Sequence, residues 1–359
     1  MGRRFMVMSG FLGAGKTTSM LAIADELAKR GVKAAIISND LGSSELVDEL
    51  YTAERAACSG AIADGCICYQ TEVLADRIKQ FSDAGGAGLV MSDIPGCGVG
   101  ALEHVYFRLA RDYPGEFELA PFTVVCDPLR LRAIMPEHAN LHLPEEINYL
   151  FRTQLLEADA IILNKTDTVS AAEQARYADF LSGSYPGIPV FPISAKTGAG
   201  IGPLADHLMS ASARLVQVDT DYGGPEFMAA EARLSWYDQR FYIKKAAAFD
   251  GCGFMGDFME AVAARLRRSG GNVPHLKVFA AGGGGDFAKA SLVGIDSAVE
   301  FDARLGRRYP AYRMVVNARA ACDSLALSAL MDEALSETAE KYGVQCRILP
   351  AGSFGASGE

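Results

Sequence analysis

A short glycine-rich run near the N-terminus limits the choice of fold more than any other feature of the chain. Residues Gly10–Thr17 read GFLGAGKT and match the pattern G-x-x-x-x-G-K-[ST]. The run stands between an apolar segment, Phe5–Met8, and a segment with helical spacing of apolar residues, Lys16–Arg30. Glycines let backbone N–H groups curl around phosphates, and a helix start adds positive charge. We therefore expect a phosphate-binding loop, not a chance glycine-rich turn.

Apolar β-rich segments alternate with helical patterns over roughly the first 215 residues. This alternation predicts an α/β fold of the P-loop NTPase type, a doubly wound parallel sheet. The expected strands are Phe5–Met8, Ala34–Ser38, Leu89–Met91, Phe122–Cys126, Ala160–Leu163 and Val190–Ile193.

The second part of the chain follows the order β-α-β-β…β-α-β, which predicts a smaller α+β domain of the ferredoxin-like kind. We expect a P-loop GTPase domain at 1–218, a linker at 219–230, the α+β domain at 231–350 and a flexible tail at 351–359.

The phosphate-binding loop assigns roles to individual residues. Lys16 is expected to reach the β- and γ-phosphates of a nucleotide, and Thr17 to ligate Mg²⁺. The rest of the predicted phosphate contacts come from Gly10, Gly13, Ala14, Gly15 and Thr18.

A second acidic position follows the expected strand Leu89–Met91. The residues Asp93-Ile94-Pro95-Gly96 form D-x-x-G, in which Asp93 would hold the hydration shell of Mg²⁺ and the Gly96 N–H would contact the γ-phosphate. The same pattern alone is common as a strand-to-loop turn. Its place downstream of a phosphate loop favours the functional interpretation.

Two further segments predict that the base is guanine. Asn164-Lys165-Thr166-Asp167 follows an expected strand, and the Asp167 carboxylate can accept hydrogen bonds from both N1–H and the 2-amino group of guanine. Lys165 would lie along the base plane. Ser194-Ala195-Lys196 follows the next strand, and its backbone would contact the guanine O6.

Composition excludes several classes of partner. The chain of 359 residues has 44 acidic against 34 basic side chains, so it lacks the basic footprint of a nucleic-acid-binding or anionic-membrane-binding protein. No apolar run approaches the roughly 18 residues of a membrane span. The apolar stretch after Arg3-Arg4 breaks at Ser9-Gly10, which argues against a signal peptide. Eight sparse cysteines favour a reduced, cytoplasmic protein.

From roughly Phe5 to Leu208 the chain resembles the CobW-type metal-chaperone GTPases, relatives of the GTPases that insert nickel into hydrogenase and urease. The matching pieces are Gly10–Thr18, Asn39-Asp40-Leu41-Gly42, Gly65-Cys66-Ile67-Cys68, Asp93–Gly96 and Ala158–Asp167. The resemblance implies GTP/GDP and Mg²⁺ as cofactors and hydrolysis of GTP by Lys16, Asp40 and Asp93. It also implies GTP, a metal ion and a client metalloprotein as partners. A homodimer is an open alternative. The sequence has no glutamine just after Gly96 to orient the water, so slow intrinsic turnover is expected.

The family's metal-binding motif is C-x-C-C, but here it reads Cys66-Ile67-Cys68-Tyr69 and lacks the third thiol. On the resemblance, the loop after Asp93 lies on the same side of the sheet, so Cys97 can supply the missing thiolate. The transferred metal would be Zn²⁺, Co²⁺ or another ion that accepts thiolates. The alternative interpretation is two inert cysteines.

Three functions therefore remain open. The leading one is a GTPase that couples its nucleotide state to delivery of a metal ion or metallocofactor. The second is a GTPase chaperone for a protein client, such as a corrinoid-dependent enzyme, without metal at its own cysteines. The third is a nucleotide-gated scaffold without enzymatic activity.

Overall fold

The computed structural model describes residues 2–39, 46–62, 65–94, 98–136, 145–220, 222–270 and 272–349, with the backbone alone at 272–274. The chain separates into two compact units. The first takes in Met1–Leu41 and Thr52–Glu231, and the second takes in Gly42–Tyr51 and Ala232–Glu359.

The first unit is built on a sheet of eight strands. Seven of them run in the order β3 (Ser59–Ile62), β2 (Ala34–Asn39), β4 (Leu89–Asp93), β1 (Arg3–Gly10), β6 (Thr123–Cys126), β7 (Ala160–Leu163) and β8 (Val190–Pro192). A short strand, β5 (Phe117–Leu119), also pairs with β1. All pairings are parallel, and β1, β2, β4, β6 and β7 are buried almost throughout. This confirms the predicted α/β fold.

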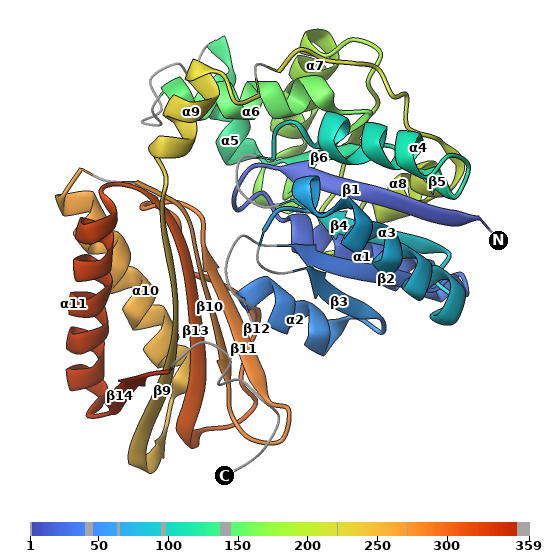
Figure 1. Cartoon of the computed structure of the whole chain (residues 1–359). Coiled ribbons are helices and arrows are strands. Elements are labelled where there is room, and N and C mark those ends of the chain that lie inside the picture. Colours follow the sequence, from blue (N-terminus) through green and yellow to red (C-terminus); the bar gives the residue numbers. More distant parts are fainter. Residues whose placement is uncertain are drawn as a thin grey trace. The chain divides into compact units, whose positions relative to one another are not determined.

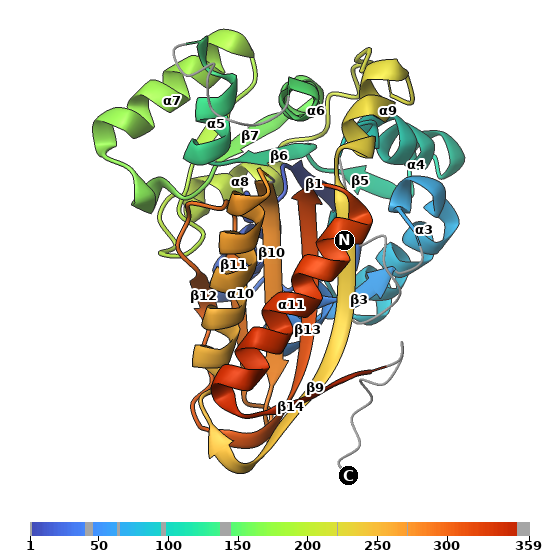
Figure 2. The same ribbon diagram turned by 90° about the vertical axis from the view of Figure 1, so that its left-hand side faces the viewer.

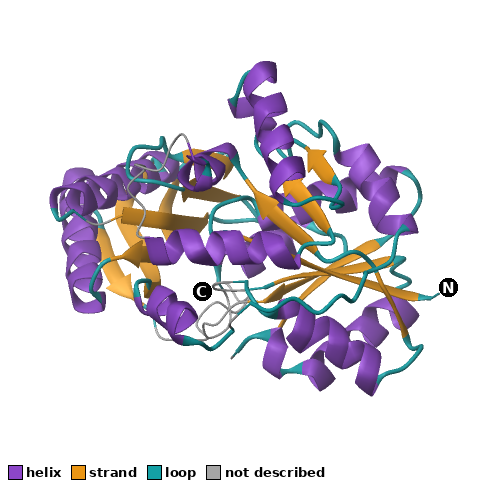
Figure 3. Cartoon of the chain, turned by 90° about the horizontal axis from the view of Figure 1, so that it is seen from above, coloured by secondary structure: helices purple, strands orange, loops and turns teal. Residues whose placement is uncertain are grey.

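Helices flank both faces of this sheet (Figures 1 and 3). They are α1 (Lys16–Lys29), α3 (Thr71–Lys79), α4 (Arg108–Asp112), α5 (Pro128–Ile134), α6 (Glu145–Glu157), α7 (Ala171–Ser184) and α8 (Ile201–Ser210), with shorter helical turns η1 (Ile67–Tyr69), η2 (Gln80–Ala84), η3 (Leu102–Phe107) and η5 (Thr166–Thr168). Capping residues set the position at which several of these helices begin. Asp127 caps α5 ahead of Pro128, and Ser170 with Glu173 forms a capping box on α7.

Residues 219–230, expected to be a linker, include most of a helix, α9 (Pro225–Ala232). Phe227 and Ala230 are buried in a cluster with Val99 and Leu150 of the first unit. Burial of this apolar face explains why a segment with turn-forming residues ends in a helix.

The second unit is an antiparallel sheet of six strands in the order β12 (Glu300–Ala303), β11 (Phe287–Leu292), β10 (Asn272–Ala281), β13 (Tyr309–Ala321), β9 (Ser235–Phe249) and β14 (Gln345–Ile348). Helices α10 (Gly251–Arg268) and α11 (Ser324–Tyr342) lie against one face (Figure 2). Without β11 and β12, the order β14-β9-β13-β10 is that of a ferredoxin-like sandwich. The pair β11–β12 extends its edge.

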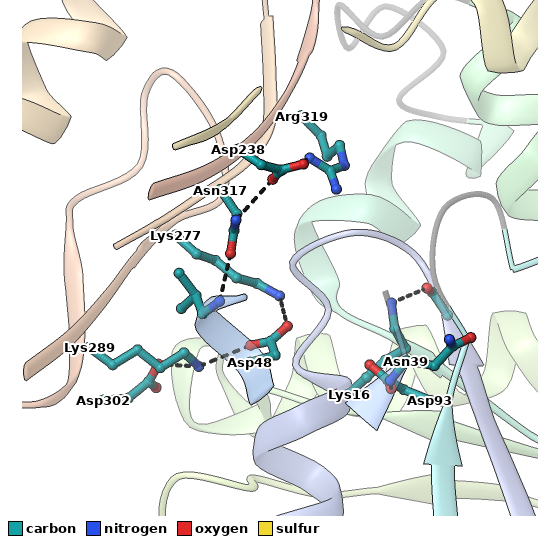
Figure 4. A network of polar contacts seen from close by, with 12 residues as sticks. Lys16, Asn39, Asp48, Asp93, Asp238, Lys277, Lys289, Asp302, Asn317 and Arg319 are labelled. Atoms are coloured by element: carbon teal, nitrogen blue, oxygen red, sulfur yellow. Dashed lines mark hydrogen bonds and ion pairs between the residues drawn. The ribbon is translucent and has the colours of Figure 1, made fainter. Parts of the chain in front are cut away.

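The first turn of α2 (Val47–Arg55) also belongs to the second unit by its contacts. The Val47 N–H donates to Asn317 Oδ1 at 2.7 Å, and Asp48 forms an ion pair with Lys277. Lys289 is buried and pairs with Asp302 at 2.9 Å and with Asp48 at 3.8 Å (Figure 4). Burial acts to lower the pKa of the Lys289 ammonium, but the two carboxylates outweigh it and the pKa is raised. A segment that lies between β2 and β3 in the sequence thus belongs to the second unit.

Candidate functional site

The loop after β1 has the backbone of a phosphate-binding loop. Gly10, Gly13 and Gly15 all have positive φ angles, of 136°, 79° and 97°. A Cβ on Gly10 would lie 2.2 Å from the Val125 carbonyl oxygen of β6, so a larger residue would push these strands apart. The Lys16 ammonium donates to the Gly10 carbonyl oxygen at 2.8 Å, which folds its side chain back over the loop. Helix α1 begins at Lys16, so the loop faces a helix N-terminus.

The segment after β7 is bonded directly to this loop. The Asn164 side chain donates from Nδ2 to the Ala14 carbonyl oxygen at 2.9 Å, and Lys165 donates from Nζ to the Gly13 carbonyl oxygen at 2.7 Å. Lys165 has a left-handed backbone, with φ of 60°. This conformation is uncommon for a residue other than glycine and often marks a functional turn.

The segment after β8 completes the same arrangement. The Ala195 N–H donates to Asn164 Oδ1 at 3.0 Å, and the Ser194 hydroxyl donates to Asp167 Oδ1 at 2.6 Å. Asp167 itself is exposed. The three predicted segments Gly10–Thr18, Asn164–Asp167 and Ser194–Lys196 therefore meet at one edge of the sheet, where the carboxyl ends of parallel strands lie.

Asp93 ends β4 at the same edge and is 6% exposed. Its carboxylate oxygen Oδ1 accepts a hydrogen bond from the backbone N–H of Asn39, the last residue of β2, at 2.9 Å (Figure 4). The buried hydroxyl of Thr17 lies at the start of α1. A hydroxyl and a carboxylate are hard oxygen donors that suit Mg²⁺.

The C-x-C segment forms a tight helical turn, η1. Cys66 caps this turn, and its Sγ accepts from the Cys68 N–H at 3.4 Å. Hydrogen bonding from Cys68 lowers the pKa of the Cys66 thiol, although burial and the charge of Asp93 act in the opposite direction. Cys66 is half-buried and Cys68 is buried. A lowered pKa favours the thiolate, which is the metal-binding form.

Tyr69 stands at the family's third cysteine position, and its side chain forms a hydrogen bond outside the cysteine segment. It is 66% exposed, and its hydroxyl lies 2.7 Å from the Tyr222 hydroxyl. Tyr222 in turn packs against His104, with 4.7 Å between ring centroids. Within the described ranges, no three potential metal ligands of the His, Cys, Asp or Glu type gather at one point.

Three predicted site residues, Asp40, Gly96 and Cys97, lie outside the described residues. Sequence reasoning missed two others. Arg130 on α5 is buried and donates to the Leu12 carbonyl oxygen of the phosphate loop at 3.0 Å. The Asn39 side chain bonds the cysteine segment. No motif pointed to Arg130, whereas Asn39 stood in a matched motif in which only Asp40 received a role.

Comparison with known proteins assigns the chain to a family. Residues 4–191, more than half of the chain, match the model for the CobW/HypB/UreG nucleotide-binding domain. The chain belongs to the CobW/HypB/UreG family. The matched range holds the phosphate loop, Asp93, the C-x-C turn and Asn164–Asp167, so these features are those of a CobW/HypB/UreG domain.

Two curated relatives of this CobW/HypB/UreG member are named zinc chaperones. YjiA of Escherichia coli is 28% identical over 178 residues, which are 47% of this chain and 51% of YjiA. CobW of Pseudomonas aeruginosa is 25% identical over 201 residues, 50% of this chain and 53% of CobW. The match thus spans about half the length of each relative.

The alignments with solved structures have lower sequence identity than the alignments with the two curated relatives. The Zn(II)-bound YjiA GTPase from E. coli covers 93% of this chain and 99% of its own, at 15% identity and a TM-score of 0.35. The alignment with HypB from Helicobacter pylori, in complex with nickel, covers 57% of this chain and 85% of HypB, at 17% identity and a TM-score of 0.39. Scores this low add nothing to the family assignment.

Among the described helices, none has the length and apolar character to cross a bilayer.

Proposed function

We propose that this protein binds GTP, hydrolyses it slowly, and couples its nucleotide state to holding and releasing a thiophilic metal ion for a client metalloprotein. One observation carries the proposal: Asn164 and Lys165 are hydrogen-bonded to the carbonyl groups of Ala14 and Gly13. This pairing makes the base-selecting segment and the phosphate loop one preorganised site.

Selection of guanine falls to Asp167 in this proposal. The Ser194 hydroxyl bonds Oδ1 of Asp167 and fixes the direction of the carboxylate. Both oxygens still have lone pairs for the N1–H and 2-amino groups of guanine. Adenine has no such pair of donors, so the lone pairs of Asp167 that face the base would receive no hydrogen bonds from it.

Hydrolysis would be direct attack of water on the γ-phosphate, favoured mainly by positioning and charge neutralisation. The Lys16 ammonium would leave the Gly10 carbonyl and neutralise the phosphates. Thr17 and Asp93 would hold Mg²⁺, which when bound withdraws charge from the phosphate oxygens. Asp40 and Gly96, which lie outside the described residues, would act as the sequence predicts. The sequence has no glutamine just after Gly96 to orient the water, which is the reason to expect slow turnover.

The metal cargo would bind at Cys66 and Cys68, with Cys97 as the proposed third thiolate. The lowered pKa of the Cys66 thiol and the shared turn support two sulfur ligands from one short segment. Relatives named zinc chaperones make Zn²⁺ the first ion to test and Co²⁺ the second.

A second function has a specific observation in its favour. Tyr69 stands where the family has a third cysteine, and its hydroxyl is engaged with Tyr222. A GTPase that acts on a protein client, without metal at its own cysteines, fits a turn with only two thiols.

Metal titration with and without nucleotide tests both functions. Untagged protein would be purified anaerobically, and Zn²⁺ and Co²⁺ affinities measured with GDP and with a non-hydrolysable GTP analogue, alongside phosphate release from GTP and ATP. Tight metal binding that depends on the nucleotide supports metal delivery. GTP hydrolysis without metal binding supports the protein-client function. Equal hydrolysis of ATP would contradict the guanine assignment.

A further inference from the structure

Asn39 joins the candidate nucleotide site to the cysteine segment. It is the last residue of β2 and is 3% exposed. Its backbone N–H donates to Asp93 Oδ1 at 2.9 Å. Its side-chain amide donates to the carbonyl oxygens of Ile62 and Gly65, both at 2.9 Å, and its Oδ1 accepts from the Ile67 N–H at 3.0 Å.

These contacts engage both amide protons of Asn39 and one of the two lone pairs on its carbonyl oxygen. The side chain therefore has one defined orientation. Aspartate would lose both donors and place a second charge near Asp93. Glutamine is longer by one methylene, which a close-packed interior does not absorb without strain. The position therefore requires asparagine for chemical reasons.

The contacts also enclose the segment that carries the thiols. Gly65 precedes Cys66, and Ile67 lies between the two cysteines, so Asn39 binds the segment on both sides of Cys66. One residue thus touches the carboxylate of Asp93 through its backbone and the cysteine turn through its side chain. A displacement of Asn39 must change both sets of hydrogen bonds together.

We propose that Asn39 is the positioning residue through which a change at the Asp93 carboxylate reaches Cys66. This inference rests on the proposed function, since it requires nucleotide binding to act on Asp93. It does not require that the cysteines bind metal. When the Asp93 carboxylate binds a new partner, its hydrogen bond to the Asn39 N–H changes. Asn39 then shifts at the end of β2, and its side-chain hydrogen bonds to Gly65 and Ile67 change with it.

Nearby Gln70 provides a matched control. Its Nε2 also donates to the Gly65 carbonyl oxygen, at 3.1 Å. Gln70 lies after η1 and is partly buried, and the bond that it makes to Gly65 does not lead to Asp93. Removal of the Gln70 amide takes one hydrogen bond away from the Gly65 carbonyl oxygen. The hydrogen bonds of Asn39 to Asp93 and to the cysteine segment stay in place.

The test measures how fast Cys66 is alkylated by iodoacetamide in full-length, metal-free, reduced protein, with the modified peptides resolved by mass spectrometry. Rates are compared between GDP and a non-hydrolysable GTP analogue, both with Mg²⁺. We expect the two rates for wild type to differ by about fivefold or more, the lower range of ordinary coupling between sites. Asn39→Ala should bring the ratio within about twofold, while Gln70→Ala keeps it. Cys346, in the second unit, should react at one rate throughout.

Two results would overturn the inference. One is a wild-type ratio near one in protein that binds and hydrolyses GTP, and the other is a wild-type ratio retained in Asn39→Ala. Protein that fails to bind GTP would instead refute the proposed function, so the two failures are distinguishable. If Asn39→Ala does not fold, Asn39→Ser serves in its place, because it removes both amide donors without adding a charge near Asp93.

Discussion

Lys165 donates a hydrogen bond from its ammonium to the carbonyl oxygen of Gly13 at 2.7 Å, across 152 residues of sequence. The left-handed backbone of Lys165 aims the side chain at the loop. Asn164 reinforces the connection through Ala14. In the proposed function, a base that sits against Asn164–Asp167 would be placed in register with phosphates bound at Gly10–Thr17, so affinity for the base and position of the γ-phosphate would depend on the same hydrogen bonds.

Replacement of Asp167 by Asn should change base preference. The variant loses the paired acceptor for guanine, which should cost about 2–4 kcal/mol, or roughly 30- to 1,000-fold in GTP affinity. Xanthine offers a carbonyl group in place of the amino group and should bind the variant better than guanine does. Isothermal titration with GTP, XTP and ATP measures this. Asp179→Asn, the same change on the exposed side of α7, should leave all three affinities as they are.

Lys16→Ala and Asp93→Asn should separate binding from chemistry. In the proposed function Lys16 neutralises phosphates directly, so its loss should weaken both nucleotide binding and hydrolysis. Asp93 acts through Mg²⁺, so Asp93→Asn should keep most of the GDP affinity and lose Mg²⁺-dependent turnover. Fluorescent-nucleotide binding and phosphate release measure the two effects. Equal and mild losses in both variants would place the phosphate site elsewhere.

Metal binding at the cysteine turn should require thiolates. Wild-type affinity for Zn²⁺ should rise with pH, with release of protons on binding. The Cys66→Ser/Cys68→Ser double variant should lose this affinity by tenfold or more, the order of a lost ligand pair. Competition against a chromogenic chelator measures it.

Matched cysteine variants sharpen this test. Burial raises the pKa of the Cys346 thiol to about 11, so Cys346→Ser should bind Zn²⁺ as wild type does. Cys97→Ser should reduce both the affinity and its dependence on nucleotide. Unchanged binding in Cys97→Ser would reject a three-thiolate site, and unchanged binding in the double variant would reject the site altogether.

The ion pairs of Asp48 should stabilise the second unit. Asp48→Asn leaves the buried ammonium of Lys289 with Asp302 and weakens the contact with Lys277, and we expect a loss of about 3 kcal/mol in the free energy of unfolding. The single tryptophan, Trp236, lies on β9 and reports this transition by its fluorescence in urea. The exposed pair of Arg267 with Asp296 gives a control, since Asp296→Asn should change stability little.

Glu157 should make stability depend on pH. It ends α6, is buried, and accepts a hydrogen bond from the Gly100 N–H at 2.8 Å. Burial raises the pKa of its carboxyl to about 7, against 4.5 for the ordinary group. The folded state therefore keeps a proton that the unfolded state releases, so stability falls as pH rises through this interval. Between pH 5.5 and 8 the loss should be about 2 kcal/mol.

Thermal or urea denaturation of wild type and Glu157→Gln across this pH range isolates the effect. Glutamine keeps an acceptor for Gly100 but does not titrate. The stability of wild type relative to the variant should decline with rising pH, and a constant difference would show that Glu157 is ionised throughout.

Six of the eight strands in the first unit followed from the sequence, since buried parallel strands are continuous apolar runs. The short strands β3 and β5 were missed, because they are only partly buried and have no such run. Element ends were harder to predict. The spacing of Phe258, Val262 and Leu266 predicts a helix at Asp257–Arg268. Helix α10 begins six residues earlier, at Gly251, because the Asp250 side chain caps it through the Gly253 N–H. Strand β9 continues past Ile243 to Phe249 through exposed residues 244–248 that have no apolar alternation. Antiparallel pairing with β13 stabilises this part of β9.

The sequence by itself determined the glycine-rich loop Gly10–Thr17 and the fold class, and it predicted the roles of Asn164–Asp167 and Asp93, because these depend on spacing within short segments and on strand–loop–helix order. Only the tertiary structure showed that Asn39 binds the segment on both sides of Cys66, that Asp48 pairs with lysines of the second sheet, and that Glu157 is buried against Gly100. Each of these contacts joins residues that are distant along the chain or placed on different elements. Periodicity and motif spacing carry no information about such pairs, since they are set by how the elements pack.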